Sequence, residues 1–217
     1  MKDLRPIKGK FYLQRVIAEG EHETQDFKFA ISDARKIARS ISAFANRGGG
    51  QLLIGVKDNG VIAGVRNEED IYVVEEAAHI HCRPAQQPDF TAFKADDGHI
   101  VIRAQIAAAE NRPVLARDTD GQWKAYYRVA DENILASPLM LKAWARRASA
   151  EPIVFQISDT EQQLLHLLQQ QAETAEHLML KLHVSKERIE DMIIRLYALE
   201  LVDFAFRDRQ FTVTLTE

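Results

Sequence analysis

Apolar and polar positions follow two different periods in the first third of the chain. In "TQDFKF" the period is two, so Phe27 and Phe29 fall on one face and Asp26 and Lys28 on the other. This alternation is typical of a half-buried strand. The period then becomes helical, and it predicts a helix that ends before three consecutive glycines, with apolar positions at Ala34, Ile37, Ala38, Ile41 and Ala45.

The next hundred residues mix strands and helices without strict alternation. "QLLIGV" predicts a buried strand, and "KDNG" predicts a hairpin turn into "VIAGV". An amphipathic segment with acidic residues in its first turn predicts a second helix over residues 67–82. Further strands are predicted over residues 88–95, 99–107, 113–117 and 124–129. The class indicated is α+β with a mixed sheet.

The pattern changes near Trp144, where "ARRASAEP" has the composition of a linker. Beyond it, Ser158 and Glu161 fit a capping box, and three helical segments precede "LVDFAF" and "QFTVTL". Three helices followed by a two-stranded ribbon resemble a winged helix-turn-helix, although Glu200 stands where that family commonly has glycine. We therefore expect a domain at residues 1–143, a linker at 144–157 and a small winged-helix domain at 158–217.

Composition limits the environment and the partners. The only cysteine, Cys82, leaves no disulfide within the chain, and no apolar run is long enough to span a membrane. We expect a cytoplasmic protein with no membrane partner. The net charge is −4, with +1 on residues 1–152 and −5 on residues 153–217. Neither part has the strong basic excess that is typical of charge-driven nucleic-acid binding.

The glycines 48–50 raise the question of a phosphate site. Loops that cradle phosphate precede a helix, where free N–H groups and the positive end of the dipole meet the anion. Here the glycines follow a helix and precede a strand, so they face the negative end. We expect one glycine to take the left-handed conformation that ends the helix, and the others to allow close approach of a neighbouring segment.

The stretch around these glycines resembles a known family. "GEHETQDFKF" followed by "SAFANRGGGQLLIGVKDNGVIAGV", and later "YYRVADENILAS", resemble the Schlafen-type AlbA-like domain from about Phe11 to Ser137. That domain is described as DNA-binding and is also labelled a divergent ATP-binding family, which implies ATP as a ligand. The residues that carry the motif are Asn46, Gly48, Gly49, Gly50 and Gly55.

In animal Schlafens a related domain carries three carboxylates of a metal-dependent RNA-cleaving site. The resemblance places these at Glu21, at Asp26, where the motif more often has glutamate, and at Asp58, with Lys28 as the neighbouring lysine. Such a site would hold Mg²⁺ or Mn²⁺, which prefer carboxylate oxygens. The same residues are equally explained by a solvated strand face and, for Asp58, by the turn.

Other candidates are cations and histidines. Phosphate contacts in the first domain are predicted at Arg35, Lys36, Arg39 and Arg47. In the small domain the predicted contacts are Lys186, Arg188, Arg195, Arg207 and Arg209, although the third helix also carries three acidic residues. His79, His81 and Cys82 lie close together, but no second pair stands at a zinc-binding spacing, so we expect no resident metal or cofactor.

Three functional hypotheses follow. The first is a nucleic-acid-binding regulator of bacterial type, binding DNA or RNA as a homodimer without obligatory catalysis. The second is a metal-dependent nuclease that uses the three carboxylates. The third is an interaction module that binds protein or nucleotide and no nucleic acid, which the acidic small domain would suit.

Overall fold

The computed structural model describes residues 4–29, 31–65, 69–153 and 155–216. The chain divides into two compact units, Met1–Leu135 and Ala136–Glu217. Helix α4 (Pro138–Ala148) belongs to the second unit, so the boundary expected at residue 143 falls inside a helix. None of the helices in the described segments has the length and hydropathy needed to cross a bilayer.

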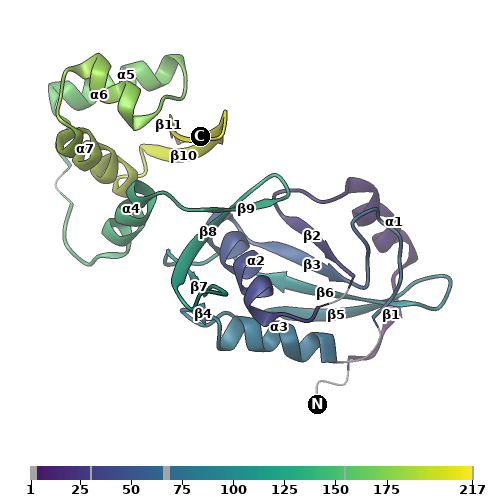
Figure 1. Ribbon diagram of the computed structural model, residues 1–217. Coiled ribbons are helices and arrows are strands. Elements are labelled where there is room, and N and C mark those ends of the chain that lie inside the picture. The colour runs from purple at the N-terminus through teal and green to yellow at the C-terminus, as the bar shows by residue number, and fades with distance from the viewer. Residues whose placement is uncertain (1–3, 30, 66–68, 154, 217) are drawn as a thin grey trace. The chain divides into compact units, whose positions relative to one another are not determined.

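The first unit contains nine strands and three helices among the described residues (Figure 1). Two helices and a strand that the sequence pattern predicted are recovered with shifted ends, namely β2 (Gln25–Lys28), α2 (Ala34–Arg47) and α3 (Glu69–His79). Helix α1 (Lys10–Glu19) was not predicted. The other strands are β1 (Ile7–Lys8), β3 (Gly50–Ile54), β4 (Cys82–Arg83), β5 (Asp89–Lys94), β6 (Ile100–Ile106), β7 (Leu115–Arg117), β8 (Trp123–Val129) and β9 (Glu132–Leu135).

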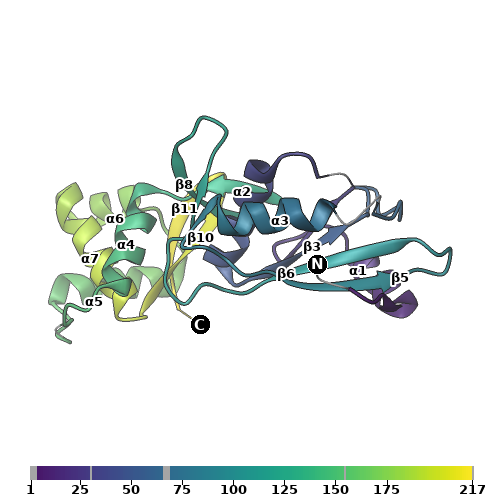
Figure 2. The same cartoon turned by 90° about the horizontal axis from the view of Figure 1, so that it is seen from below.

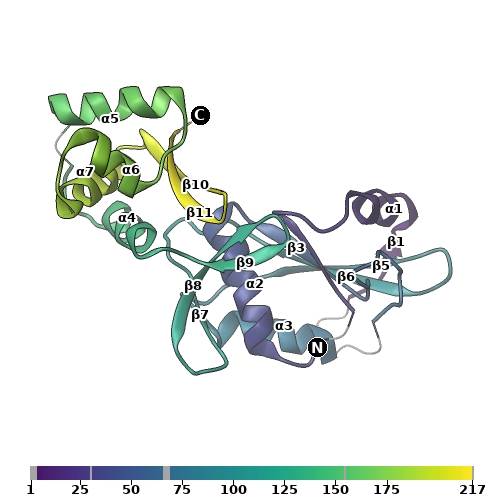
Figure 3. The same cartoon turned by 45° about the horizontal axis from the view of Figure 1, so that its top comes forward.

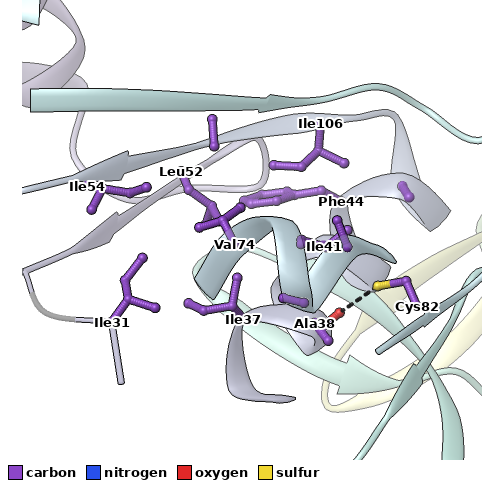
Figure 4. Packing of buried hydrophobic residues seen from close by; sticks show 14 of the residues in the cluster. Ile31, Ile37, Ala38, Ile41, Phe44, Leu52, Ile54, Val74, Cys82 and Ile106 are labelled. Atoms are coloured by element: carbon purple, nitrogen blue, oxygen red, sulfur yellow. Dashed lines mark hydrogen bonds between the residues drawn. The ribbon is translucent and has the colours of Figure 1, made fainter. Parts of the chain in front are cut away.

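A mixed five-stranded sheet in the order β1-β5-β6-β3-β2 divides two apolar cores. Helices α2 and α3 cover one face and α1 covers the other, as Figure 2 shows. Phe27 packs with Leu13 and Val16 of α1, whereas Leu52 and Ile54 point to the α2 side (Figure 4). Because helices lie on both faces, the half-buried interpretation of β2 is wrong: three of its four residues are buried.

A second sheet, in the order β4-β7-β8-β9, packs on α2 through a buried asparagine. Asn46 Nδ2 donates to the carbonyl oxygens of Val114, at 2.9 Å, and Tyr126, at 2.8 Å. Its Oδ1 accepts from the Val114 N–H at 2.7 Å. Ser42 Oγ also donates to the Val114 carbonyl oxygen. Asn46 therefore joins the helix to the loop before β7 and to β8, and supplies partners for buried backbone groups.

Cys82 lies inside the larger core. Its Sγ is 3.8 Å from the carbonyl oxygen of Ala38 (Figure 4), and burial raises the pKa of the thiol to about 12. His81 instead has its Nε2 3.3 Å from a carboxylate oxygen of Glu76. The thiol therefore serves as an apolar core group, with little thiolate character at neutral pH.

The three glycines turn the chain from α2 into β3. The Gly48 and Gly49 N–H groups both donate to the Phe44 carbonyl oxygen, which ends the helix. Gly49 has φ +87°, and a Cβ there would meet the Ile106 carbonyl oxygen at 2.8 Å. A Cβ on Gly50 would meet the Phe44 ring at 2.3 Å. Chain reversal and close approach, rather than an anion, account for these glycines.

The predicted hairpin after β3 forms only in part. Lys57 N–H donates to the Val61 carbonyl oxygen at 3.0 Å, but the expected strand at residues 61–65 is reduced to one bridge between Val56 and Ile62. The Ala63 and Gly64 N–H groups turn back to the Gly55 carbonyl oxygen instead. Gly55, at φ +96°, gives this segment the room it needs.

In its described residues, the second unit has four helices followed by a two-stranded antiparallel sheet (Figures 1 and 3). The predicted capping box of Ser158 and Glu161 is present, and Thr174 and Ser185 cap the next two helices. Glu200 has φ +61°, a left-handed conformation that suits the glycine more common there. The elements after α4 are α5 (Asp159–Gln170), α6 (Ala175–Leu182), α7 (Lys186–Ala198), β10 (Val202–Arg207) and β11 (Gln210–Leu215).

We predict that Gly49→Ala destabilises the first unit by at least about 2 kcal/mol, since it combines left-handed strain with a backbone collision. Urea unfolding followed by circular dichroism measures this loss. Gly48→Ala is the matched control, because a Cβ at Gly48 meets no atom within 4 Å. Equal losses for the two variants would contradict the assigned roles.

Glu173 provides a pH test in the second unit. A hydrogen bond from Lys181, aided by Gln171 and His177, lowers the pKa of Glu173 from 4.5 to about 2. A lowered carboxyl pKa stabilises the fold above the unfolded value, and this contribution is lost as the pH falls from about 4.5 toward 2. We expect Glu173→Gln to cost about 1–2 kcal/mol at pH 7, given solvent screening at half-exposed Lys181. The cost, measured by urea unfolding, should shrink at pH 3; a pH-independent cost would refute the ionic role.

Candidate functional site

The predicted carboxylate site lies along the outer edge of β2, which ends the five-stranded sheet. Glu21 accepts a hydrogen bond from the Phe27 N–H at 2.8 Å. Lys28 Nζ donates to the Phe27 carbonyl oxygen at 2.8 Å, and an arginine from β8, Arg128, donates to the Gln25 carbonyl oxygen at 3.3 Å. These charged side chains occupy backbone groups that an edge strand otherwise offers to another chain.

Asp26 lies between these side chains and Ser40 of α2, and it is 4% exposed. Its Oδ2 lies 2.8 Å from Lys28 Nζ and accepts from Ser40 Oγ at 3.3 Å. Its Oδ1 lies 3.4 Å from a guanidinium nitrogen of Arg128. Both carboxylate oxygens are therefore already engaged by cations or donors of the chain itself.

Arg128 is the central residue of this site, and the sequence analysis did not single it out. It is 1% exposed, packs on the Phe44 ring, and donates to Asn133 Oδ1 at 3.0 Å. Asn133 Nδ2 in turn donates to Ser40 Oγ at 3.0 Å. The sequence held one signal for this residue, because Arg128 lies in the "YYRVADENILAS" segment that carries part of the resemblance. The segment alone does not indicate which residue the arginine pairs with.

The pKa values of the two carboxyl groups at β2 shift in opposite directions. Burial and a hydrogen bond to Asp26 raise the pKa of Glu21 above its ordinary value. For Asp26, burial opposes ionisation, but the hydrogen bond from Glu21 and the charges of Lys28 and Arg128 hold the pKa below its ordinary value. Asp26 is thus the ionised partner and Glu21 the one that retains a proton more readily.

These residues do not fit a divalent cation as the resemblance implied. Glu21 and Asp26 come together, but Asp58 lies in the exposed turn after β3, and no group of three or more His, Cys, Asp or Glu side chains among the described residues could hold a metal ion. Lys28 and Arg128 also supply the positive charge that a metal would bring. Within the fold, Glu21 accepts a hydrogen bond from the edge strand, and Asp26 neutralises Lys28 and Arg128.

Most of the predicted phosphate contacts on α2 have partners inside the first unit. Arg39 forms an ion pair with Asp118, and Arg35 donates to the Thr119 carbonyl oxygen at 3.3 Å. Arg47 lies 2.6 Å from Glu23 and also donates to the Arg128 carbonyl oxygen. Lys36 is exposed. Carboxylates therefore neutralise two of the four predicted cations on this helix, Arg39 and Arg47.

The predicted contacts in the second unit separate into two groups. Arg195 forms an ion pair with Glu161, and Lys186 lies 4.0 Å from Glu190. Arg207 and Arg209 are exposed at the turn between β10 and β11, on either side of Asp208. Arg188 is exposed on α7 next to acidic neighbours. The turn is the more basic surface, and α7 is neutral to acidic.

Comparison with known proteins adds a family. A family model described as "Schlafen, AlbA_2" matches residues 21–137, more than half of the chain. No curated protein matches the sequence. A crystal structure of the DIP2311 protein from Corynebacterium diphtheriae resembles this one with 19% identity and a TM-score of 0.45. That alignment covers 88% of this chain and 34% of the other, so this chain spans about a third of that protein.

We predict unequal losses of stability when the two carboxyl groups at β2 are replaced by amides. Asp26→Asn leaves Arg128 buried without its counter-charge and should destabilise the unit by about 3–5 kcal/mol. Glu21→Gln imitates a protonated carboxyl group that still accepts from Phe27, so its cost should stay below about 1 kcal/mol. Urea unfolding at pH 7 measures both. Similar losses for the two variants would contradict the assigned charge states.

Proposed function

The chain belongs to the Schlafen AlbA_2 family, and from that premise we propose that it binds nucleic acid as a transcriptional regulator of bacterial type. The observation that carries the proposal is the family match over residues 21–137, in a domain type associated with nucleic acids. The predicted cytoplasmic location fits this role. Neither obligatory catalysis nor a resident cofactor is part of the proposal.

The arrangement at β2 favours binding over cleavage. A nuclease of the kind suggested by the resemblance needs carboxylate oxygens free to meet a metal ion and a phosphate. Here the oxygens of Asp26 are engaged by Lys28, Arg128 and Ser40, and Glu21 accepts from a backbone N–H. The family fold is retained, whereas its cleavage chemistry does not follow from the fold.

For the second unit we propose a winged helix. The order α5, α6, α7, β10, β11 supports this assignment, with the β10–β11 turn as the wing. The pairing of Arg195 and Lys186 with glutamates leaves α7 poorly suited to phosphate, so the nucleic-acid contact is assigned to Arg207 and Arg209 on the wing. The chain acts as a homodimer, as winged-helix regulators that read two half-sites do.

Fluorescence anisotropy with labelled single- and double-stranded DNA and RNA tests the proposal. We expect affinity to fall as salt rises from about 50 to 200 mM, and Arg207→Ala/Arg209→Ala to flatten the log–log salt slope by roughly 1–2. Lys10→Ala, which removes a cation paired with Asp96 in the first unit, is the control and should leave the slope unchanged.

Manganese added after binding separates the alternatives. A signal that stays constant supports binding without cleavage, whereas a fall that Glu21→Gln abolishes while the variant remains folded would establish the nuclease alternative. No signal change on any nucleic acid at low salt would reject the proposed function and favour a protein- or nucleotide-binding module.

A further inference from the structure

The second unit carries an apolar groove across α6, α7 and the β10–β11 sheet. Two adjoining hollows of about 410 and 390 Å³ share Ala175, Lys186 and Glu190 in their lining. The first hollow continues over Met179 and Ile189, and the second over the strand residues Phe204, Phe211 and Val213. The groove thus combines apolar side chains with the charged residues Lys186 and Glu190, which both hollows share.

The chemistry of this groove does not suit a nucleic acid. Its floor offers methyl, thioether and aromatic groups, and the carboxylates of Glu176 and Glu190 stand among the lining residues. Glu190 already neutralises Lys142 at 2.6 Å and faces Lys186 at 4.0 Å. Phosphates need cations that are free to replace counterions, and the groove has no such excess. An apolar side chain is the better occupant.

An apolar side chain stands exposed beside the groove. Leu180 on α6 is 60% exposed, one helical turn after Glu176 on the same side of the helix. The surface thus holds both an apolar projection and an apolar hollow. Its charges are also mixed, because Lys186, whose side chain is 76% exposed, lies on α7 and Glu176 lies on α6.

We propose that the occupant is a second copy of this chain, joined through α6 and α7 about a two-fold axis. In such an interface each side contributes the same patch, so Leu180 of one copy enters the hollow over the partner's Met179. Lys186 then faces the partner's Glu176, and the reciprocal pair forms on the other side. The mixed charge of the patch is self-complementary in this arrangement. The inference rests on the homodimer in the proposed function and assigns its surface.

Sedimentation velocity over a range of protein concentrations tests the surface. Wild-type protein should reach twice the 24.7 kDa mass of the chain. Leu180→Glu should raise the dissociation constant at least tenfold, because it replaces the apolar contact with Met179 by a carboxylate close to Glu176 and Glu190. Ile80→Glu is the matched control: Ile80 is also 60% exposed but belongs to the first unit, and this variant should dimerise as the wild type does.

A charge exchange tests the proposed pairing directly. Lys186→Glu and Glu176→Lys should each weaken the dimer about tenfold, since each brings like charges together. The double variant Lys186→Glu/Glu176→Lys should return to within about threefold of wild type, because the pair is re-formed with its signs reversed. Far-ultraviolet circular dichroism checks that all variants remain folded, as expected for substitutions at exposed positions.

The outcomes separate the surface from the wider proposal. Wild-type protein that stays monomeric at all concentrations overturns both the homodimer and this surface. A dimer that resists Leu180→Glu, or that the double variant does not restore, overturns the surface alone. A Leu180→Glu variant that keeps the doubled mass but loses nucleic-acid binding in the anisotropy assay would make the groove a nucleic-acid surface and also overturn the inference.

Discussion

The buried ion pair between Arg128 and Asp26 holds the first unit together. Arg128 comes from β8 of one sheet and Asp26 from β2 of the other, and Ser40 of α2 bonds to Asp26 and, through Asn133, completes the link. An unpaired charge at such depth costs several kcal/mol, so the buried guanidinium of Arg128 requires the carboxylate of Asp26. Arg128 also donates a hydrogen bond to the Gln25 carbonyl oxygen, a backbone group at the outer edge of β2. Asn46 adds a neutral link between α2 and the second sheet.

This constraint limits what the family's carboxylates do in this chain. Asp26 already forms ion pairs with Lys28 and Arg128, and Glu21 accepts a hydrogen bond from the Phe27 N–H of the strand. A site that neutralises its own charge has little left with which to attract a metal ion, and Asp58 lies apart in a turn. Glu21 and Lys28 instead bond to the backbone of the sheet edge at Phe27. A shared fold therefore does not transfer a shared reaction.

In the second unit, too, acidic side chains neutralise basic ones within the fold. Glu161 neutralises Arg195, and Glu190 lies between Lys142 and Lys186, so the helix that would read DNA has little positive charge to offer. The exposed arginines of the β10–β11 turn and the apolar groove across α6 and α7 are then surfaces of different character. On our proposals, the turn contacts nucleic acid and the groove contacts a second copy.

The sequence by itself determined the local elements and the family. Several local features depend only on neighbours within a few positions, so they could be predicted. They are the helical and two-residue periods, the caps at Ser158, Thr174 and Ser185, and the chain reversal at Gly49. The pattern missed α1, β9 and the burial of β2. It also treated the arginines of α2 as free, because a partner such as Asp118 for Arg39 lies far away along the chain. The pairing of Asp26 with Arg128 joins residues from different sheets. Only the tertiary structure decided which charges remain available for a ligand, since neutralisation depends on distance in space and not on spacing in sequence.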